Sequence, residues 1–197
     1  MSSIGPAPTA TSPRVDVNTP ENHGVLTSTE RETLREKAIA VARTVTDPEM
    51  PMLTLEDLGV LREVEVDEAG QVVVAITPTY TGCPAMAAMR DDLVRSLQEA
   101  GLPGARVRVS LTPAWSSDWI SERGRQALRD HGLSAPGRVP ARSGPVALSL
   151  MPTRREIDCP RCGSAQTELT SEFGPTACKA LYRCTSCFEP FEHVKEI

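Results

Sequence analysis

The chain has 197 residues and a formal net charge of −5, with 40 % hydrophobic and 24 % charged residues, as in ordinary globular proteins. The negative charge argues against nucleic-acid binding, which needs a clustered basic surface, and no apolar run reaches the roughly 18 residues of a membrane span. Because the first 19 residues lack the apolar segment of a secretory signal, we expect a cytoplasmic protein. Its six cysteines are then metal ligands or reactive thiols rather than disulfides.

The first part of the chain predicts a tail and a helix. Residues 1–26 are rich in Pro, Ser, Thr and Ala without an apolar period, which predicts a disordered tail. A helix is expected to begin near Thr27 or Thr29, each of which has a glutamate three residues later for a capping box. It is expected to end at Pro48. The carboxylates of the following turn, Asp47 and Glu49, are by themselves most simply explained as solvated turn residues.

The middle of the chain predicts a small α+β domain with the order helix, strand, strand, helix, strand. Its strands are expected at residues 60–66, 71–77 and 106–111, with the alternate apolar residues of the third strand facing the core. The second helix follows Pro84, has an apolar stripe along one face and closes at Gly101. A short helix ends near His131, and we expect Trp115 and Trp119 to be core or interface anchors. This domain is assigned to residues 27–133.

Cys83 stands immediately before Pro84, where it would cap the second helix. The unpaired N–H groups and the dipole at a helix N-terminus stabilise a thiolate, so we expect the pKa of Cys83 to be lowered. Cys83 is therefore a candidate reactive thiol or soft-metal ligand. The alternative is a buried cysteine that packs as a small hydrophobe, and position alone does not decide between the two.

The last part of the chain predicts a linker and a metal-binding ribbon. Residues 134–152 are rich in Pro and Gly and predict a linker, within which residues 146–151 could dock on a neighbouring surface. Residues 153–197 contain two C-x-x-C pairs, which predict a closed tetrahedral Zn²⁺ site; the ligands are Cys159, Cys162, Cys184 and Cys187. A rubredoxin-like iron site and disulfides are the alternatives. Such a small domain would depend on its metal to fold.

The ribbon is expected to have strands near residues 166–173, 180–183 and 188–194. Four aromatic residues are expected to cover the metal site: Phe173, Tyr182, Phe188 and Phe191. Cys178 lies outside both pairs and is interpreted as a packing residue or an accessible thiol rather than a ligand. His193 could in principle replace a cysteine ligand.

Residues from about 30 to 112 resemble the SufT-like family of iron–sulfur assembly proteins. The matching features are Asp47-Pro48-Glu49, Leu58-Gly59-Val60 and Thr81-Gly82-Cys83-Pro84. The resemblance implies that Cys83 is the functional thiol, that Asp47 and Glu49 lie near it, and that iron or an iron–sulfur cluster binds there transiently.

The later motifs resemble the PaaD family, also called PaaJ. These motifs are Pro113-Ala114-Trp115 with Asp118-Trp119, the two C-x-x-C pairs, and the stretch from Ser171 to Cys184, in which Pro175 is a small departure from the family pattern. The family implies an accessory subunit of the phenylacetyl-CoA epoxidase, or phenylacetate-CoA oxygenase, complex of aerobic phenylacetate degradation. Its partners would be a di-iron oxygenase and a reductase with flavin and a [2Fe–2S] cluster.

Two motifs are missing from the sequence, and this limits the roles that we expect for the protein. The chain lacks the paired Glu-x-x-His motifs of a di-iron site and the glycine fingerprint of a nicotinamide-binding fold. We therefore expect a non-catalytic subunit that matures or delivers iron or iron–sulfur clusters to the oxygenase or reductase. The alternatives are rubredoxin-like electron transfer and a zinc-ribbon interaction or regulatory module. Because four thiolates leave no open position on the ion, the ribbon site is expected to be structural.

Overall fold

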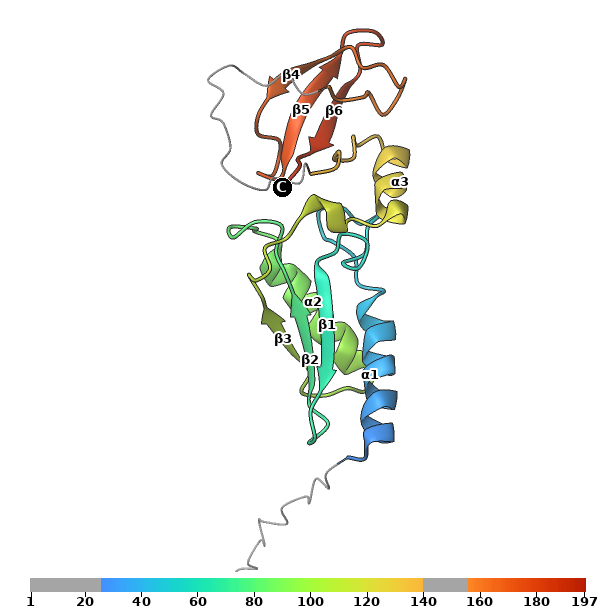
Figure 1. The fold of residues 1–197 in the computed structure, drawn as a ribbon, viewed down its shortest axis with the longest axis vertical. Helices are drawn as coiled ribbons and strands as arrows, with labels where there is room; N and C mark the ends of the chain where they lie inside the picture. Colours follow the sequence, from blue (N-terminus) through green and yellow to red (C-terminus); the bar gives the residue numbers. More distant parts are fainter. Residues whose placement is uncertain (1–25, 140–155) are drawn as a thin grey trace, which may run out of the picture.

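The computed structural model describes residues 26–139 and 156–197. Figure 1 shows two units stacked along the long axis of the molecule, one with helices α1 and α2 beside strands β1–β3 and one with strands β4–β6. The α+β class and the C-terminal ribbon are as predicted. The expected tail, apart from Leu26, and the possible docking segment 146–151 lie outside the described residues.

Helix α1 (Ser28–Ala42) begins at the predicted capping box. The backbone N–H of Thr27 donates to the Glu30 carboxylate at 2.8 Å, and the N–H of Glu30 donates to the Thr27 hydroxyl at 3.3 Å. The predicted end at Pro48 is wrong, because the helix stops at Ala42. The Thr44 hydroxyl donates to the carbonyl of Val41 at 2.8 Å, and the chain then pairs in an extended conformation through Thr46 and Thr54. The β-branched run from Thr44 to Thr46 suits that extended conformation better than a helix.

The first sheet has the order β1-β2-β3. Strand β1 (Leu61–Val66) pairs antiparallel with β2 (Val72–Ile76), and β3 (Arg106–Val109) pairs parallel with β2. The parallel connection runs through helix α2 (Met86–Glu99), which contacts α1 and β3. The buried residues of α2 are Met89, Leu93 and Leu97, so the predicted apolar stripe of this helix does form one side of the core.

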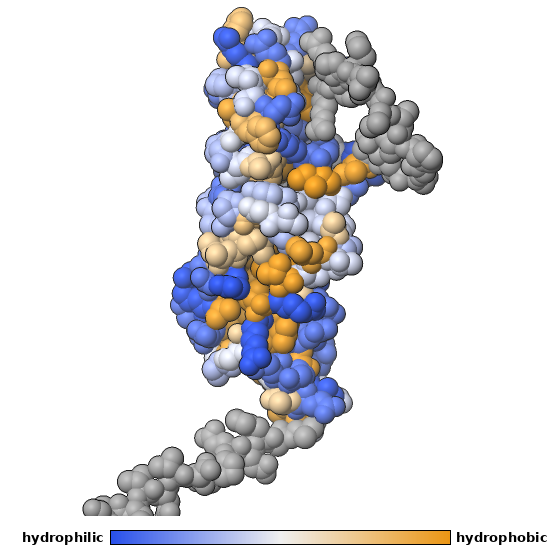
Figure 2. Space-filling view, turned by 90° about the vertical axis from the view of Figure 1, so that its left-hand side faces the viewer, coloured by the Kyte–Doolittle hydropathy of each residue, from blue (hydrophilic) through white to orange (hydrophobic). Residues whose placement is uncertain are grey.

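Strand β3 differs from the prediction. It ends at Val109, and the side chains of Val109 and Leu111 are 48 % and 56 % exposed instead of facing the core. The strand lies at the edge of the sheet, so only Val107 reaches the core cluster. Figure 2 shows this side of the molecule, on which hydrophobic residues lie among hydrophilic ones.

The segment after the sheet is anchored by tryptophans, as expected. It contains a 3-10 turn, η1 (Ser117–Trp119), and helix α3 (Glu122–Asp130). The indole N–H of Trp115 donates to the carbonyl of Leu58 at 2.9 Å. The Arg62 guanidinium lies 3.7 Å from the centre of the Trp119 ring. Gly59 adopts φ +67°, and a Cβ at this position would lie 2.5 Å from the Cβ of Trp119. Glycine is therefore required there.

The second unit is an antiparallel sheet of β4 (Thr167–Ser171), β5 (Lys179–Cys184) and β6 (Pro190–Val194). Its small core contains two cysteines together with Tyr182 and Phe191. Two of the four aromatic residues that were expected to cover the metal site therefore lie in this core. Phe173 and Phe188 are 67 % and 64 % exposed and do not belong to this core.

The two units join through residues that were predicted to be linker. Ser134 forms a parallel bridge with His193 of β6: its N–H donates to the Glu192 carbonyl at 2.8 Å, and its carbonyl accepts from the Val194 N–H at 3.0 Å. The N–H of Ser117 donates to the carbonyl of Ile197 at 3.0 Å. Val194, only 4 % exposed, belongs to the core of the first unit. In the described residues, no helix is both long enough and apolar enough to span a bilayer.

Candidate functional site

The four paired cysteines form one cluster in the ribbon. Their sulfur atoms all lie within 4.8 Å of one another, and among the described residues they form the only such group of three or more His, Cys, Asp or Glu side chains. Each cysteine pair lies in a tight backbone turn. Gly163 follows the first pair at φ +72°, and Phe188 follows the second at φ +65°. The two turns therefore have the same left-handed end, although only one of them has the residue that favours it.

The cluster has the dimensions of a tetrahedral metal site. A Zn²⁺ ion about 2.3 Å from each of four sulfurs sets neighbouring sulfurs roughly 3.8 Å apart. The Cys159 and Cys187 sulfurs are 3.8 Å apart, and those of Cys162 and Cys184 are 3.6 Å apart. The four cysteines thus fit a metal ion bound by four sulfurs. If the ion is Zn²⁺, it would cross-link the two turns without redox chemistry.

The environment of these thiols also favours a cation. The backbone N–H of Cys187 and that of Ser186 donate to the Cys184 sulfur, both at 3.4 Å, and with the neighbouring thiols they lower the pKa of Cys184 to about 6. The N–H of Ser164 lowers the pKa of Cys162, but the adjacent thiols and burial raise it to about 12. Four thiols so close together cannot all ionise alone, whereas a divalent cation stabilises all four thiolates.

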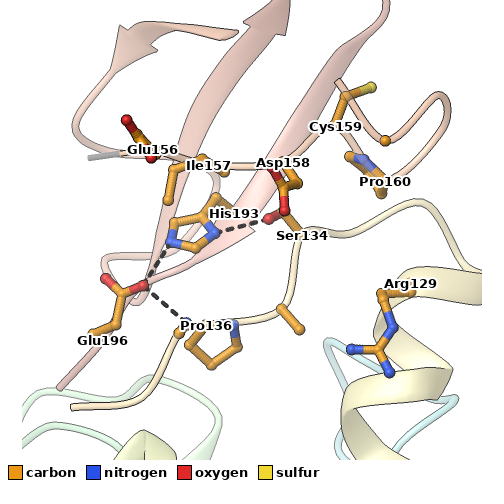
Figure 3. Close-up of a pocket in the computed structure, with 13 residues that line it drawn as sticks. Arg129, Ser134, Pro136, Glu156, Ile157, Asp158, Cys159, Pro160, His193 and Glu196 are labelled. Atoms are coloured by element: carbon orange, nitrogen blue, oxygen red, sulfur yellow. Dashed lines mark hydrogen bonds and ion pairs between the residues drawn. The ribbon is translucent and has the colours of Figure 1, made fainter. Parts of the chain in front are cut away.

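His193 is not part of this cluster. Figure 3 shows its ring between Ser134 and Glu196, at the edge of a pocket between the two units. Its Nδ1 is 3.1 Å from the Ser134 hydroxyl, and its Nε2 is 3.4 Å from a Glu196 carboxylate oxygen. The second distance suits an ion pair better than a hydrogen bond. The same carboxylate accepts the N–H of Gly137 at 3.0 Å.

A serine, a histidine and a glutamate in one row suggest a hydrolase triad, but the geometry indicates a structural role. His193 is 1 % exposed and Ser134 is 7 % exposed, and both belong to the backbone bridge that joins the units. An activated nucleophile must instead reach a substrate. These three side chains hold the segment after α3 against β6. Sequence reasoning missed this arrangement because Ser134 and His193 meet only in the folded chain.

Cys83 lies in the loop between β2 and α2, and the expected capping geometry is wrong. Helix α2 begins at Met86 with Ala85 as its N-cap residue, so Cys83 precedes the helix by three residues. Its N–H donates to the Tyr80 carbonyl at 3.2 Å. Its side chain is partly buried against the first core.

The pKa of Cys83 is raised, contrary to the expectation from a helix cap. Burial is the largest cause. The N–H of Ala85 lowers the pKa in part, and the nearby Cys178 thiol and the carboxylates of Asp47 and Glu49 raise it again. Desolvation and like charges therefore outweigh the backbone dipoles.

The two acidic residues implied by the family resemblance lie within electrostatic range of Cys83. Asp47 is buried, and one of its carboxylate oxygens accepts the N–H groups of Glu49 and Met50, both at 2.8 Å. Burial raises its pKa, and these two hydrogen bonds and the Lys179 charge lower it in part. Asp47 therefore holds the turn in shape, while the side chain of Glu49 is exposed.

Cys178 was interpreted as a packing residue or an accessible thiol of the ribbon, but the fold places it close to the first unit. It lies within electrostatic range of Cys83 and also of Tyr80, the pKa of which is raised mainly by burial. The Thr176 hydroxyl lies 3.1 Å from the Cys178 sulfur. No spacing rule in the sequence links Cys178 with Cys83, because the two residues belong to different domains.

Two family models match the chain. One, described as iron–sulfur cluster assembly protein, matches residues 35–111, and the other, described as PaaD zinc beta ribbon domain, matches residues 143–195. A curated Escherichia coli (strain K12) protein, provisionally assigned as one of the subunits of 1,2-phenylacetyl-CoA epoxidase, is 42 % identical over 116 residues. The match covers 59 % of this chain and 66 % of that relative, which is just under two thirds of its length.

Solved structures similar to this chain include a domain of unknown function (DUF59) from Bacillus anthracis, with 28 % identity, a TM-score of 0.47, and coverage of 52 % of this chain and 97 % of that one. A conserved hypothetical protein from Thermotoga maritima has 20 % identity, a TM-score of 0.41, and coverage of 53 % and 96 %. All these TM-scores are below 0.5, so the assignment rests on the sequence matches. The chain is thus similar to iron–sulfur cluster assembly proteins over residues 35–111 and to the PaaD zinc beta ribbon domain over residues 143–195, and it resembles a relative assigned as a phenylacetyl-CoA epoxidase subunit.

Proposed function

We propose that this protein is an accessory, non-catalytic component of a phenylacetyl-CoA epoxidase system, and that it matures or delivers iron or iron–sulfur clusters to the oxygenase or the reductase. One observation carries the proposal: a single chain joins an iron–sulfur cluster assembly domain to a PaaD zinc ribbon. The first domain supplies a thiol for cargo, and the second supplies the specificity for one oxygenase system.

Cys83 is the thiol that would hold the cargo transiently. It is only partly buried, so a donor or client can reach it. Its raised pKa keeps it protonated near neutral pH until a metal ion displaces the proton, because only the thiolate binds metal. Weak binding that depends on deprotonation suits a carrier that must also release its cargo.

The ribbon would dock the client. Its four-cysteine site has no open position for a substrate, but its surface carries Phe173 and Phe188, both largely exposed. Exposed aromatic side chains are frequent anchors of protein interfaces. We therefore assign recognition of the oxygenase or reductase to this surface.

The test is a Cys83→Ala strain grown on phenylacetate, with the metal and cluster content of the purified oxygenase and reductase measured. The expected result is under-loaded client protein and slow growth. Thr81→Ala is the matched control, because Thr81 is an exposed residue of the same loop without a thiol. Normal growth together with fully loaded reductase and oxygenase would remove the assigned role of Cys83.

A second candidate function is electron transfer by iron in the ribbon site. The residue after the second cysteine pair would be glycine in a rubredoxin turn, yet Phe188 adopts the same left-handed conformation at φ +65°. The phenylalanine therefore does not exclude that geometry. Purified protein would be red and redox-active under this hypothesis, whereas colourless protein with about one zinc per chain contradicts it.

A further inference from the structure

The end of the ribbon that carries Cys178 is the end that docks on the first domain. In β5 and β6, Lys179 pairs with Val194, and the Cys178 carbonyl accepts the N–H of Lys195 at 2.9 Å. Val194 is buried in the core of the first domain. Cys178 therefore lies at the junction between the domains. It is followed by Lys179, the partner of Val194, which belongs to β6 and is also buried in the core of the first domain. In Figure 1 this end of β5 and β6 faces the loop between β2 and α2.

Cys83 approaches the same junction from the other side. It lies in the loop between β2 and α2, and its side chain packs against the core cluster that contains Val194. Both thiols are neither fully buried nor fully exposed. Neither is in a disulfide, and neither belongs to the four-cysteine cluster of the ribbon.

The charges around the two thiols are mostly negative. The Cys178 thiol and the carboxylates of Asp47 and Glu49 all raise the pKa of Cys83. A positive charge acts on Asp47 from Lys179, but this ammonium group is held by Glu192 at 2.8 Å. A cation stabilises thiolates and carboxylates that lie close together in this way.

We propose that Cys83 and Cys178 are the two thiolate ligands of a second metal site, formed only where the two domains meet, and that its cargo is Fe²⁺. The identity of the cargo rests on the proposed function; the two-thiol site does not. Binding releases one proton from each thiol and forms two metal–sulfur bonds, with no change in oxidation state. The exposed carboxylate of Glu49, which acts electrostatically on Cys83, is a candidate oxygen ligand.

This site differs from the ribbon site in being open. In the described part of the chain, no third donor completes a compact group around Cys83 and Cys178 of the kind seen in the ribbon. An ion on two thiolates keeps positions for water or for ligands of a client protein, which permits transfer. The Thr176 hydroxyl, 3.1 Å from the Cys178 sulfur, orients that thiol.

The test uses full-length protein with the ribbon saturated with zinc, titrated anaerobically with Co²⁺ as the probe. Thiolate-to-cobalt charge-transfer absorption reports sulfur ligation, and zinc content is followed in parallel. Wild type is expected to bind one further Co²⁺ without losing zinc. Cys83→Ser and Cys178→Ser are each expected to weaken this binding at least ~10-fold and to reduce the absorption, since loss of even an outer-shell partner costs about 10–100-fold in metal affinity.

Thr81→Ala is the control and is expected to bind as wild type. Retained zinc and an unchanged thermal unfolding curve would show that each variant is folded. Unaltered Co²⁺ binding by Cys178→Ser would overturn the two-thiol site, and so would Co²⁺ uptake only in exchange for zinc. These results are distinct from failure of the proposed function, in which Co²⁺ binding needs both thiols but a Cys83→Ala strain still loads its oxygenase and reductase.

Discussion

The two cysteine sites of this protein have opposite constructions. In the ribbon, four sulfurs come from two local turns, and backbone N–H groups from the second turn point at one of them. At the junction, two thiols come from different domains, and burial and negative charge act on Cys83. The four ribbon sulfurs would close around an ion and hold the fold together, whereas the proposed site of Cys83 and Cys178 would stay open at a domain boundary. A permanent metal site and a transfer site would thus have different surroundings in this protein.

The largest effect is expected from Cys184→Ser, which opens the closed site. Cys184 is completely buried, and structural zinc sites contribute about 10–16 kcal/mol of apparent binding free energy in small domains. We expect loss of zinc and unfolding of β4–β6, while the first domain stays folded around Trp115. Metal analysis and hydrogen exchange measure the two effects. Cys178→Ser is the control and should keep its zinc; a Cys184→Ser protein with full zinc would contradict the closed site.

Gly59→Ala is expected to have the next largest effect, on the first-domain side of the junction. The left-handed backbone costs about 1–2 kcal/mol for a residue with a Cβ, and overpacking against Trp119 costs about 1–3 kcal/mol. We therefore expect a loss of about 2–5 kcal/mol in the free energy of unfolding measured in urea, with zinc content unchanged. Gly132→Ala is the matched control, since Gly132 also has positive φ but nothing within 4 Å of an added Cβ. Equal losses in the two variants would rule out the clash.

The junction is also expected to weaken in acid through Glu196. The contact with His193 lowers the pKa of Glu196 from 4.5 to about 2. A lowered folded-state pKa means that its stabilising effect is complete above the unfolded value of 4.5 and is lost as pH falls through about 2. Hydrogen exchange of the Val194 amide, which donates to Ser134, measures this loss.

Glu196→Gln is the control for that experiment, because other groups, including the ribbon thiols, also take up protons in acid. At neutral pH, the Val194 amide should exchange faster in the variant than in wild type. This difference in exchange rate should become smaller as the pH falls. A constant difference across this pH range would mean that the charge of Glu196 does not hold the junction.

The smallest effect is expected from Phe188→Gly, which relaxes the second turn of the closed site. Glycine removes the cost of φ +65°, about 1–2 kcal/mol, but loses about 0.5–1 kcal/mol through the freedom of the unfolded chain. The free energy of unfolding of the zinc-bound ribbon is expected to rise by about 0.5–1 kcal/mol. A higher midpoint of thermal unfolding measures this gain. Phe188→Ala should show no such gain, because it removes the ring but keeps the Cβ.

Local features of the sequence predicted most elements well. The capping box at Thr27, the apolar stripe of α2 and the cysteine spacing of the ribbon all depend on residues close together in the chain. The errors came where other contacts dominate. Helix α1 ends before Pro48 because the following residues pair with Thr54 and Leu55, and Val109 is exposed because β3 lies at the edge of its sheet.

The sequence by itself determined the order of the elements and the four ribbon ligands, because periodicity, capping and paired cysteines act over a few residues. Only the tertiary structure decided which groups surround Cys83. Cys83 was a candidate reactive thiol at a helix end, and Cys178 was interpreted as a packing residue or an accessible thiol rather than a ligand. Docking of β6 on the first core places Cys178 within electrostatic range of Cys83, and burial with acidic neighbours raises the pKa that local position was expected to lower. Desolvation and long-range charge depend on the whole fold, so no short motif encodes them.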